Sequence, residues 1–370
     1  MSTLAFVPAP IAELPWRVLF LVSAITGFGL VVLYSAAGGH LMPWALPQGA
    51  RFVVFLGMAI AMSRMRPDRL KGAAFPAYVI VFFLLVAVEA LGFVGGGARR
   101  WLNLGFIRVQ PSELMKPVIV LTIARFYDLL PAGEIRRFSA IWPAAGLIGL
   151  PAAFILVQPD LGTAMMVVFG GLVVMFLAGL PLRLFLGGLG AVAVAVPVAF
   201  SMMHDYQRQR ITIFLNPESD PLGAGYHISQ SQIAIGSGGI FGKGFMNGTQ
   251  SHLDYLPEGH TDFIFATMAE EWGLLGGLFL IVAFSMVIWW GINVALDARD
   301  RFSRLTAAGL TTTIFFYVAI NLMMVMGLAP VVGIPLPLVS YGGSAMLTIM
   351  LCLGALMSID RQNRRDERRR

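Results

Sequence analysis

The chain is poor in charged residues, cysteine and histidine, and each shortage excludes a class of protein. Only 12% of its 370 residues are charged, whereas 57% are apolar. Soluble domains carry roughly 25% charged residues, so the composition excludes an ordinary soluble domain and indicates an integral membrane protein. The single cysteine, Cys352, cannot form an internal disulfide. The five histidines and this cysteine do not show the spacing of a zinc site.

Apolar runs of about 20 residues, the length needed to cross a bilayer, recur along the chain. They predict about ten transmembrane helices, near residues 17–38, 46–63, 73–92, 112–129, 139–157, 161–180, 184–203, 262–295, 305–328 and 338–358. We therefore expect an all-α integral membrane protein with a large extracytoplasmic loop, residues 204–261, between spans 7 and 8. This transmembrane domain, 17–358, would lie between a cytoplasmic segment, 1–16, and a basic cytoplasmic tail, 359–370.

The net charge of +6 does not indicate nucleic acid, because the basic residues are spread over short inter-helix segments and one tail. With the amino terminus placed in the cytoplasm, 18 of the 26 basic residues fall on inner segments. This asymmetry follows the positive-inside rule and predicts that both termini are cytoplasmic. The inner set is Arg17, Arg64, Arg66, Arg69, Lys71, Arg125, Arg136, Arg137, Arg183, Arg299, Arg301, Arg304, Arg361, Arg364, Arg365, Arg368, Arg369 and Arg370.

Two outer segments are long enough to carry a function, residues 93–111 and the loop 204–261. Loops of such length in compact proteins are usually functional or disordered. Aromatic and aliphatic residues such as Tyr226 and Ile233 disfavour disorder here. We expect a short amphipathic helix near 226–235, and a loop that folds over the outer face of the bundle.

A polar run, residues 248–262, ends at Asp262 and passes directly into an apolar helix. A charge costs about 2.5 to 3.5 kcal/mol at the centre of a membrane helix and less near the interface. Asp262 should therefore have either a partner or a task. One interpretation is helix capping, with Thr261 as the cap and Asp262 in the first turn, where the helix dipole would keep it ionised. The other is that Asp262 acts on a substrate.

A second polar group precedes the fourth span. Pro-Ser-Glu is typical of a helix start, and its glutamate, Glu113, would share a helix face with Lys116. One interpretation is a structural ion pair. The other is that Arg99, Arg100 and Lys116 hold an anionic group, since arginine binds phosphate through its bidentate fork. Trp101 suits the membrane–water boundary.

Two further motifs are weaker. Asp160, in Gln-Pro-Asp-Leu-Gly, fits a turn with a helix cap. The glycine-rich segment 236–244 lacks the spacing of a nucleotide phosphate loop and is interpreted as a flexible turn. The residues alone thus predict an outer-face site for an anionic substrate, with a lipid-linked substrate as one interpretation, and they do not specify a reaction.

Five segments taken together resemble the SEDS (shape, elongation, division and sporulation) family, and more closely its rod-shape branch than its division branch. The similarity extends over residues 17–358. The segments are QPSELMKP (110–117), QPDLGTA (158–164), GYHISQSQIAIGSGGIFGKG (225–244), GTQSHLDYLPEGHTDFIFA (248–266) and PLPLVSYGGSAM (335–346).

This resemblance implies an inverting peptidoglycan glycosyltransferase that polymerises lipid II on the outer face of the bacterial cytoplasmic (inner) membrane, during cell elongation and rod-shape maintenance. It implies catalytic roles for Asp262, Glu113 and Lys116. Asp262 would act as general base or hold a divalent cation such as Mg²⁺ or Mn²⁺. We expect substrate binding by Arg99, Arg100, Trp101, Gln110, Ser112, Asp160, Gln250, Glu258, His260 and Thr261.

The implied partners are lipid II and the nascent glycan strand, a crosslinking class B penicillin-binding protein (transpeptidase), other elongation-complex proteins and membrane lipid, but no nucleic acid. Two alternatives are a lipid II flippase and a non-catalytic scaffold of the wall-synthesis complex. A flippase should carry charged groups along its whole depth, or at a midplane site between broken helices. Most charges here lie at the outer edge, although Glu270 and Glu271 lie about two turns deeper in the eighth span.

Overall fold

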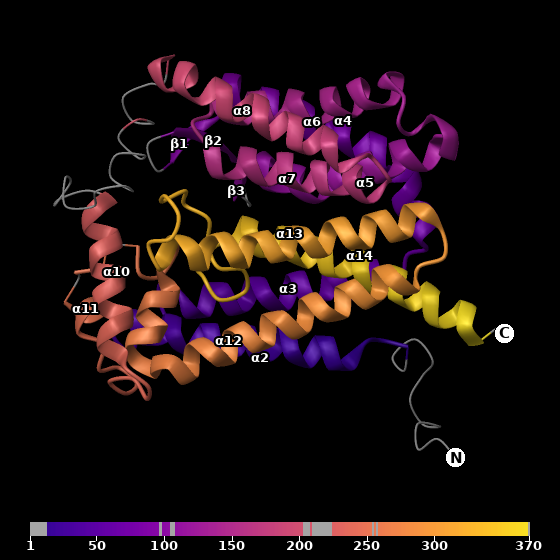
Figure 1. The fold of residues 1–370 in the computed structure, drawn as a ribbon. Coiled ribbons are helices and arrows are strands. Elements are labelled where there is room, and N and C mark those ends of the chain that lie inside the picture. The colour runs from indigo at the N-terminus through magenta and orange to yellow at the C-terminus, as the bar shows by residue number, and fades with distance from the viewer. Residues whose placement is uncertain are drawn as a thin grey trace.

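The computed structural model describes residues 13–95, 98–103, 108–202, 208, 224–253, 255–256 and 258–368. Within these ranges each of the ten predicted spans has a helix, and the helices form a bundle (Figure 1). They are α2 (Trp16–Ala36), α3 (Ala45–Ser63), α4 (Pro67–Leu91), α5 (Pro111–Leu129), α6 (Phe138–Val157), α7 (Leu161–Leu177), α8 (Leu182–Met202), α12 (Ile264–Asp297), α13 (Arg301–Val325) and α14 (Gly343–Arg368). The predicted fold of a multi-pass, helical membrane protein is confirmed.

Several helices begin where the sequence carries a start signal. Pro67 and Pro111 occupy the first positions of α4 and α5, where a missing N–H is tolerated. The side chain of Asp160 accepts a hydrogen bond from Thr163 N at 3.2 Å and caps α7. Asp300 caps α13 in the same way. The cap predicted for Asp160 is therefore confirmed.

The centre of the bundle is formed by α5, α13 and α14. Helix α5 packs on α4, α7 and α13, while α14 packs on α3. Large apolar side chains on outward faces, such as Phe83 and Val194, are exposed in the chain itself. Such side chains suit lipid contact, because a spanning helix satisfies its own backbone groups and can present apolar surface to the bilayer.

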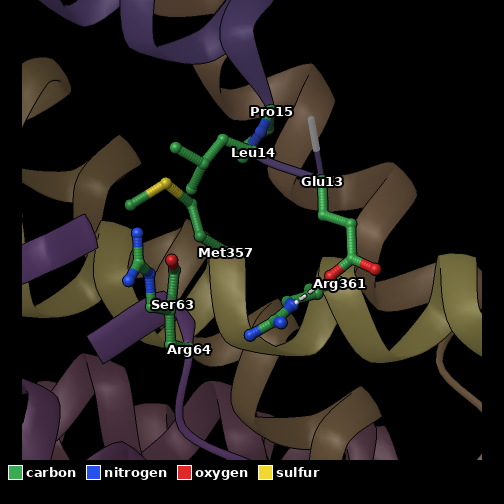
Figure 2. Close-up of a pocket in the computed structure, with 7 residues that line it drawn as sticks. All are labelled: Glu13, Leu14, Pro15, Ser63, Arg64, Met357 and Arg361. Atoms are coloured by element: carbon green, nitrogen blue, oxygen red, sulfur yellow. Dashed lines mark hydrogen bonds and ion pairs between the residues drawn. The ribbon is translucent and has the colours of Figure 1, made fainter. Parts of the chain in front are cut away.

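Helix α2 begins and α14 ends at the same end of the bundle (Figure 1). We call this the termini end. There Arg361 Nε donates to Glu13 Oε2 at 2.7 Å, and Arg365 contacts the same oxygen at 3.0 Å. The hydrogen bond from Arg361 holds the pKa of Glu13 below its usual value. Figure 2 shows the shallow pocket around this pair, with Ser63 and Met357 among its lining residues.

The opposite end carries three short strands and two extra helices (Figure 1). We call it the strand end. Strands β1 (Phe93–Gly95), β2 (Ala98–Asn103) and β3 (Arg108–Val109) form a small antiparallel sheet that was not expected from the sequence. Helix α10 (Ala224–Gly238) confirms the helix expected near 226–235, and it packs on α12. A four-residue helix, α11 (Thr249–His252), follows it.

Two predicted helices differ from the structure in extent. Helix α14 begins at Gly343 and continues to Arg368, so the basic residues after position 358 extend a helix within the described range. Helix α12 is interrupted at Gly273, whose φ of 62° and ψ of −157° are not helical. The eighth span is therefore two helical pieces joined at a glycine.

Candidate functional site

Asp262 lies at the strand end, two residues before α12 begins. The cap position of α12 is Phe263, and no side chain caps it. The capping interpretation of Asp262 and Thr261 is therefore wrong. The backbone carbonyl of Asp262 accepts a hydrogen bond from Asn321 Nδ2 at 2.9 Å. Its carboxylate lies against Gly333: a Cβ added to this glycine would lie 3.4 Å from Asp262 Oδ2.

Burial, followed by repulsion from Glu258, raises the pKa of Asp262 from 3.8 to about 6. This direction is opposite to the one expected from a helix dipole. A carboxylate that titrates near neutral pH is suited to accept a proton from a substrate hydroxyl, because base catalysis is most efficient when the pKa lies near the working pH.

A tight turn places Glu258 near Asp262. Glu258 has a φ of 56°, in the left-handed region that is uncommon for a residue with a side chain. Thr261 Oγ1 donates to Glu258 Oε2 at 2.5 Å, and Phe263 N donates to Glu258 O at 3.2 Å. The turn thus gathers four predicted site residues, Glu258, His260, Thr261 and Asp262, into one short segment.

Aromatic and cationic side chains border this segment. Trp44 stacks on His260 with ring centres 4.0 Å apart and planes 9° apart. Tyr341 N donates to His260 O at 2.9 Å. Arg51 lies over the Tyr341 ring at 4.8 Å and donates to its hydroxyl at 3.3 Å. Burial lowers the pKa of His260, which favours its neutral form.

Trp44, Arg51 and Tyr341 were not among the predicted site residues. Signals for two of them were present in the sequence. Arg51 interrupts the apolar run of the second span, and Tyr341 lies in the segment PLPLVSYGGSAM. Nothing local indicated that these residues meet, since Arg51 and Tyr341 are 290 positions apart.

The predicted ion pair of Glu113 and Lys116 is confirmed and lies inside the bundle. The two side chains are 2.6 Å apart, and the residues are 5% and 1% exposed. Lys116 Nζ also donates to the Tyr317 hydroxyl at 2.8 Å, and this hydroxyl in turn donates to Glu113. Tyr317 lies one helical turn from Asn321 on α13, so the ion pair lies one turn away from the residue that holds Asp262.

The remaining predicted residues before α5 and α7 form a separate group. Arg100 donates to Gln158 O at 3.0 Å and to Pro159 O at 2.5 Å. Gln110 Nε2 donates to Asp160 Oδ2 at 3.1 Å. These contacts fasten the sheet and the start of α5 to the turn between α6 and α7.

Other predicted residues of this region are placed mainly by the backbone. Arg99 and Trp101 lie in β2, paired with residues of β1. Ser112 is buried, and its hydroxyl has no hydrogen-bond partner among the described residues. The group adjoins the Asp262 segment through residues 332–333, because a Cβ at Gly162 of α7 would lie 2.9 Å from Val332 O.

Gln250 lies in α11 and contacts Glu270 rather than the Asp262 carboxylate. Its backbone N–H donates to Glu270 Oε1 at 3.1 Å. Glu270 is fully buried and paired with Lys243, while Glu271 contacts Ser35. The Glu270 charge is thus paired with a lysine, whereas Glu271 accepts from a hydroxyl and lies 3.6 Å from His252 Nε2.

Comparison with known proteins identifies the family. Residues 15–365 match the model of the FtsW/RodA/SpoVE family, whose members are described as cell cycle proteins. The chain belongs to this family. Among curated relatives, the peptidoglycan glycosyltransferase MrdB of Escherichia coli (strain K12) is 46% identical over 344 residues, which cover 92% of each chain. The peptidoglycan glycosyltransferase RodA of Treponema pallidum (strain Nichols) is 31% identical over 95% of this chain and 98% of its own.

Solved structures agree with this membership in the FtsW/RodA/SpoVE family. One chain, from a peptidoglycan synthase complex that coordinates polymerization and crosslinking, matches with a TM-score of 0.82 and 34% identity, over 95% of this chain and 98% of that one. The rod shape determining protein RodA of Thermus thermophilus matches with a TM-score of 0.71 and 30% identity, over 95% and 97%.

The residues of the site that could hold a divalent cation are two carboxylates. Asp262 and Glu258 interact electrostatically. The described residues contain no group of three metal-ligating side chains. Mg²⁺ is commonly held by one or two carboxylates together with substrate phosphates and water, so this pair fits a cation that arrives with a diphosphate substrate.

Proposed function

We propose that this chain is a peptidoglycan glycosyltransferase that polymerises lipid II into glycan strands during cell elongation and rod-shape maintenance. The observation that carries the proposal is Asp262, a carboxylate with a pKa of about 6 beside Glu258 and bordered by Trp44, His260 and Tyr341. Aromatic rings and carboxylates together suit a sugar whose hydroxyl must lose a proton.

In the proposed reaction, Asp262 removes the proton from the 4-hydroxyl of an acceptor N-acetylglucosamine. The resulting oxygen attacks C1 of the donor N-acetylmuramic acid, and the bond from C1 to the diphosphate oxygen breaks. Undecaprenyl diphosphate leaves with the bonding electrons, and the anomeric centre inverts. A positioned base of this kind contributes about 10²- to 10⁴-fold in rate.

The leaving diphosphate requires positive charge nearby. Arg51 supplies it from α3 beside Tyr341, and Arg100 supplies it from β2. Lys116 is 1% exposed and bonded to Glu113 and Tyr317. We therefore propose that Glu113 and Lys116 contribute by fixing α5 against α13 next to the site.

We propose that both termini are cytoplasmic and that the strand end lies on the outer face of the bacterial inner membrane. The excess of basic residues on the predicted inner segments supports this orientation. The start of α2 and the end of α14 share one end of the bundle, opposite the start of α12 (Figure 1). Asp262 lies two residues before α12, which supports an outer-face site.

We propose a class B penicillin-binding protein as partner, together with other elongation-complex proteins. The supporting observation is that a chain from a peptidoglycan synthase complex, which coordinates polymerization and crosslinking, matches 95% of this chain. We expect this chain to co-purify with the transpeptidase. We also expect the polymerisation rate to be higher when the transpeptidase is present.

Two roles for Asp262 are separated by chelation. If Asp262 acts as base without a metal, EDTA leaves the rate of strand synthesis unchanged. If Asp262 and Glu258 hold a cation against the diphosphate, EDTA abolishes synthesis and added Mg²⁺ or Mn²⁺ restores it.

The proposed function is tested with the purified chain, fluorescent lipid II in detergent and no other polymerase. Glycan strands are the expected product. A flippase would move lipid II across vesicle membranes without forming strands, and a scaffold would do neither, so either of these results would overturn the proposal.

A further inference from the structure

The glycine-rich segment 239–244 is inserted into the break of α12 at Gly273. Leu274 N donates to Gly239 O at 2.9 Å, and Lys243 N donates to Glu270 O at 2.9 Å. These bonds satisfy backbone groups that the break would otherwise leave without partners. The segment is therefore a structural insert, and the turn predicted for it is present at residues 239–241.

Glycine is required at the contact itself. A Cβ at Gly242 would lie 2.1 Å from the carbonyl oxygen of Glu271, and one at Gly273 would lie 2.4 Å from Gly242 N. Both glycines also have positive φ, which disfavours residues with side chains. The close fit holds the insert at a defined height along α12.

The carboxylate of Glu270 fastens the chain that follows the insert. The residue is 0% exposed. Its Oε1 accepts from Lys243 Nζ at 2.6 Å, from Thr249 N and Thr249 Oγ1 at 2.9 Å each, and from Gln250 N at 3.1 Å. A buried carboxylate is tolerated only when it is paired and hydrogen-bonded in this way, so the four donors and the charge depend on one another.

The segment fastened at Glu270 precedes the Glu258–Asp262 turn in the chain. From Gln250 the chain makes a further bond, Leu256 N to Gln250 O at 3.1 Å. It meets α12 again where Thr267 Oγ1 donates to Gly259 O at 3.0 Å. Among the described residues, side-chain hydrogen bonds thus attach the chain from Thr249 to Asp262 to α12 at two points, Glu270 and Thr267, of which Glu270 is the charged one.

We propose that Glu270 is a positioning residue, whose ionised carboxylate anchors residues 243–250 and thereby fixes the Glu258–Asp262 turn in its reactive position. This inference rests on the proposed function of Asp262. It assigns to Glu270 a role in holding the site, in place of the transport role that its depth in the membrane suggested.

The test compares Glu270→Gln with Glu13→Gln in the full-length protein. Both variants neutralise an ion-paired carboxylate, but the Glu13 carboxylate pairs with Arg361 (Figure 2), away from the strand end. Hydrogen exchange of peptides within 239–262 is measured together with kcat and KM for lipid II. We expect Glu270→Gln to speed exchange in this stretch at least about tenfold and to lower kcat by about 10- to 100-fold, since a 1 Å misplacement costs about 100-fold. Glu13→Gln should change neither.

Milder variants keep the test decisive if Glu270→Gln does not fold. Lys243→Gln and Thr249→Val each remove one donor to Glu270, whereas Lys243→Arg keeps the charge and should restore kcat. Two results in folded variants would overturn the positioning role. One is faster hydrogen exchange within 239–262 with a wild-type kcat, and the other is unchanged hydrogen exchange there. If the wild-type chain makes no strands, the proposed function fails, and the exchange measurement reports separately whether the anchor exists.

Discussion

Asn321 joins the two chain segments that meet at the candidate site. Its side-chain amide donates to Asp262 O at 2.9 Å and to Ile334 O at 2.7 Å. Ile334 follows Gly333, which lies against the Asp262 carboxylate. One fully buried side chain on α13 therefore sets the distance between the proposed base and the wall that faces it.

Replacing Asn321 with leucine should weaken both stability and activity. The change removes two hydrogen bonds and leaves two carbonyls without this donor, at a cost of about 1 to 3 kcal/mol for each unsatisfied group. Strand synthesis should fall at least about tenfold, because the Asp262 backbone loses its anchor. Thr312→Val is the matched control, since among the described residues the hydroxyl of Thr312, on the same helix, bonds to its own helix at Ala308 O. Equal rates for the two variants would contradict the assigned role.

Lys116→Met should destabilise the fold strongly. It leaves the Glu113 carboxylate buried without its cationic partner, and breaking a buried pair in this way costs about 3 to 5 kcal/mol. The double variant Glu113→Gln with Lys116→Met should recover much of the loss, because no charge remains buried there. The stabilities of the single and double variants are measured in detergent by unfolding each protein with heat or denaturant. If Lys116→Met alone were as stable as wild type, the ion pair would not hold α5 in place.

Strand synthesis should decline as the pH falls through about 6, since protonated Asp262 cannot accept a proton. The expected slope is about tenfold per pH unit below this point. Glu258→Gln should move the acid limb to lower pH, because Glu258 raises the pKa of Asp262. Glu134→Gln, at an exposed ion pair between α5 and α6, should leave the profile unchanged. An acid limb that does not move would remove Glu258 from the electrostatics of the site.

Asp262→Asn should be more stable than wild type at pH 8. The folded-state pKa is raised from 3.8 to about 6, so the carboxyl stabilises the fold below pH 3.8 and this stabilisation is lost as the pH rises through about 6. The ionised group thus costs at most about 3 kcal/mol at pH 8, and less with solvent screening. Melting temperatures at pH 8 and pH 5 should differ more for wild type than for the variant. A variant less stable than wild type at pH 8 would contradict the raised pKa.

The helices were predictable because each consists of a long apolar run, and the Glu113–Lys116 pair because residues three apart share a helix face. The break at Gly273 was not, since it depends on an insert some thirty positions earlier in the chain. Arg51 meets Tyr341 only after the whole bundle has assembled. The raised pKa of Asp262 also required the structure, because local sequence indicated a helix dipole that would act in the opposite direction.

The central claim is that Asp262 performs the proton transfer of glycan polymerisation, and purified Asp262→Asn tests it most directly. The variant should elute as a folded protein and should polymerise fluorescent lipid II at least about 100-fold more slowly than wild type, the lower bound for loss of a positioned base. Strand synthesis by folded Asp262→Asn at a rate near that of wild type would contradict the account.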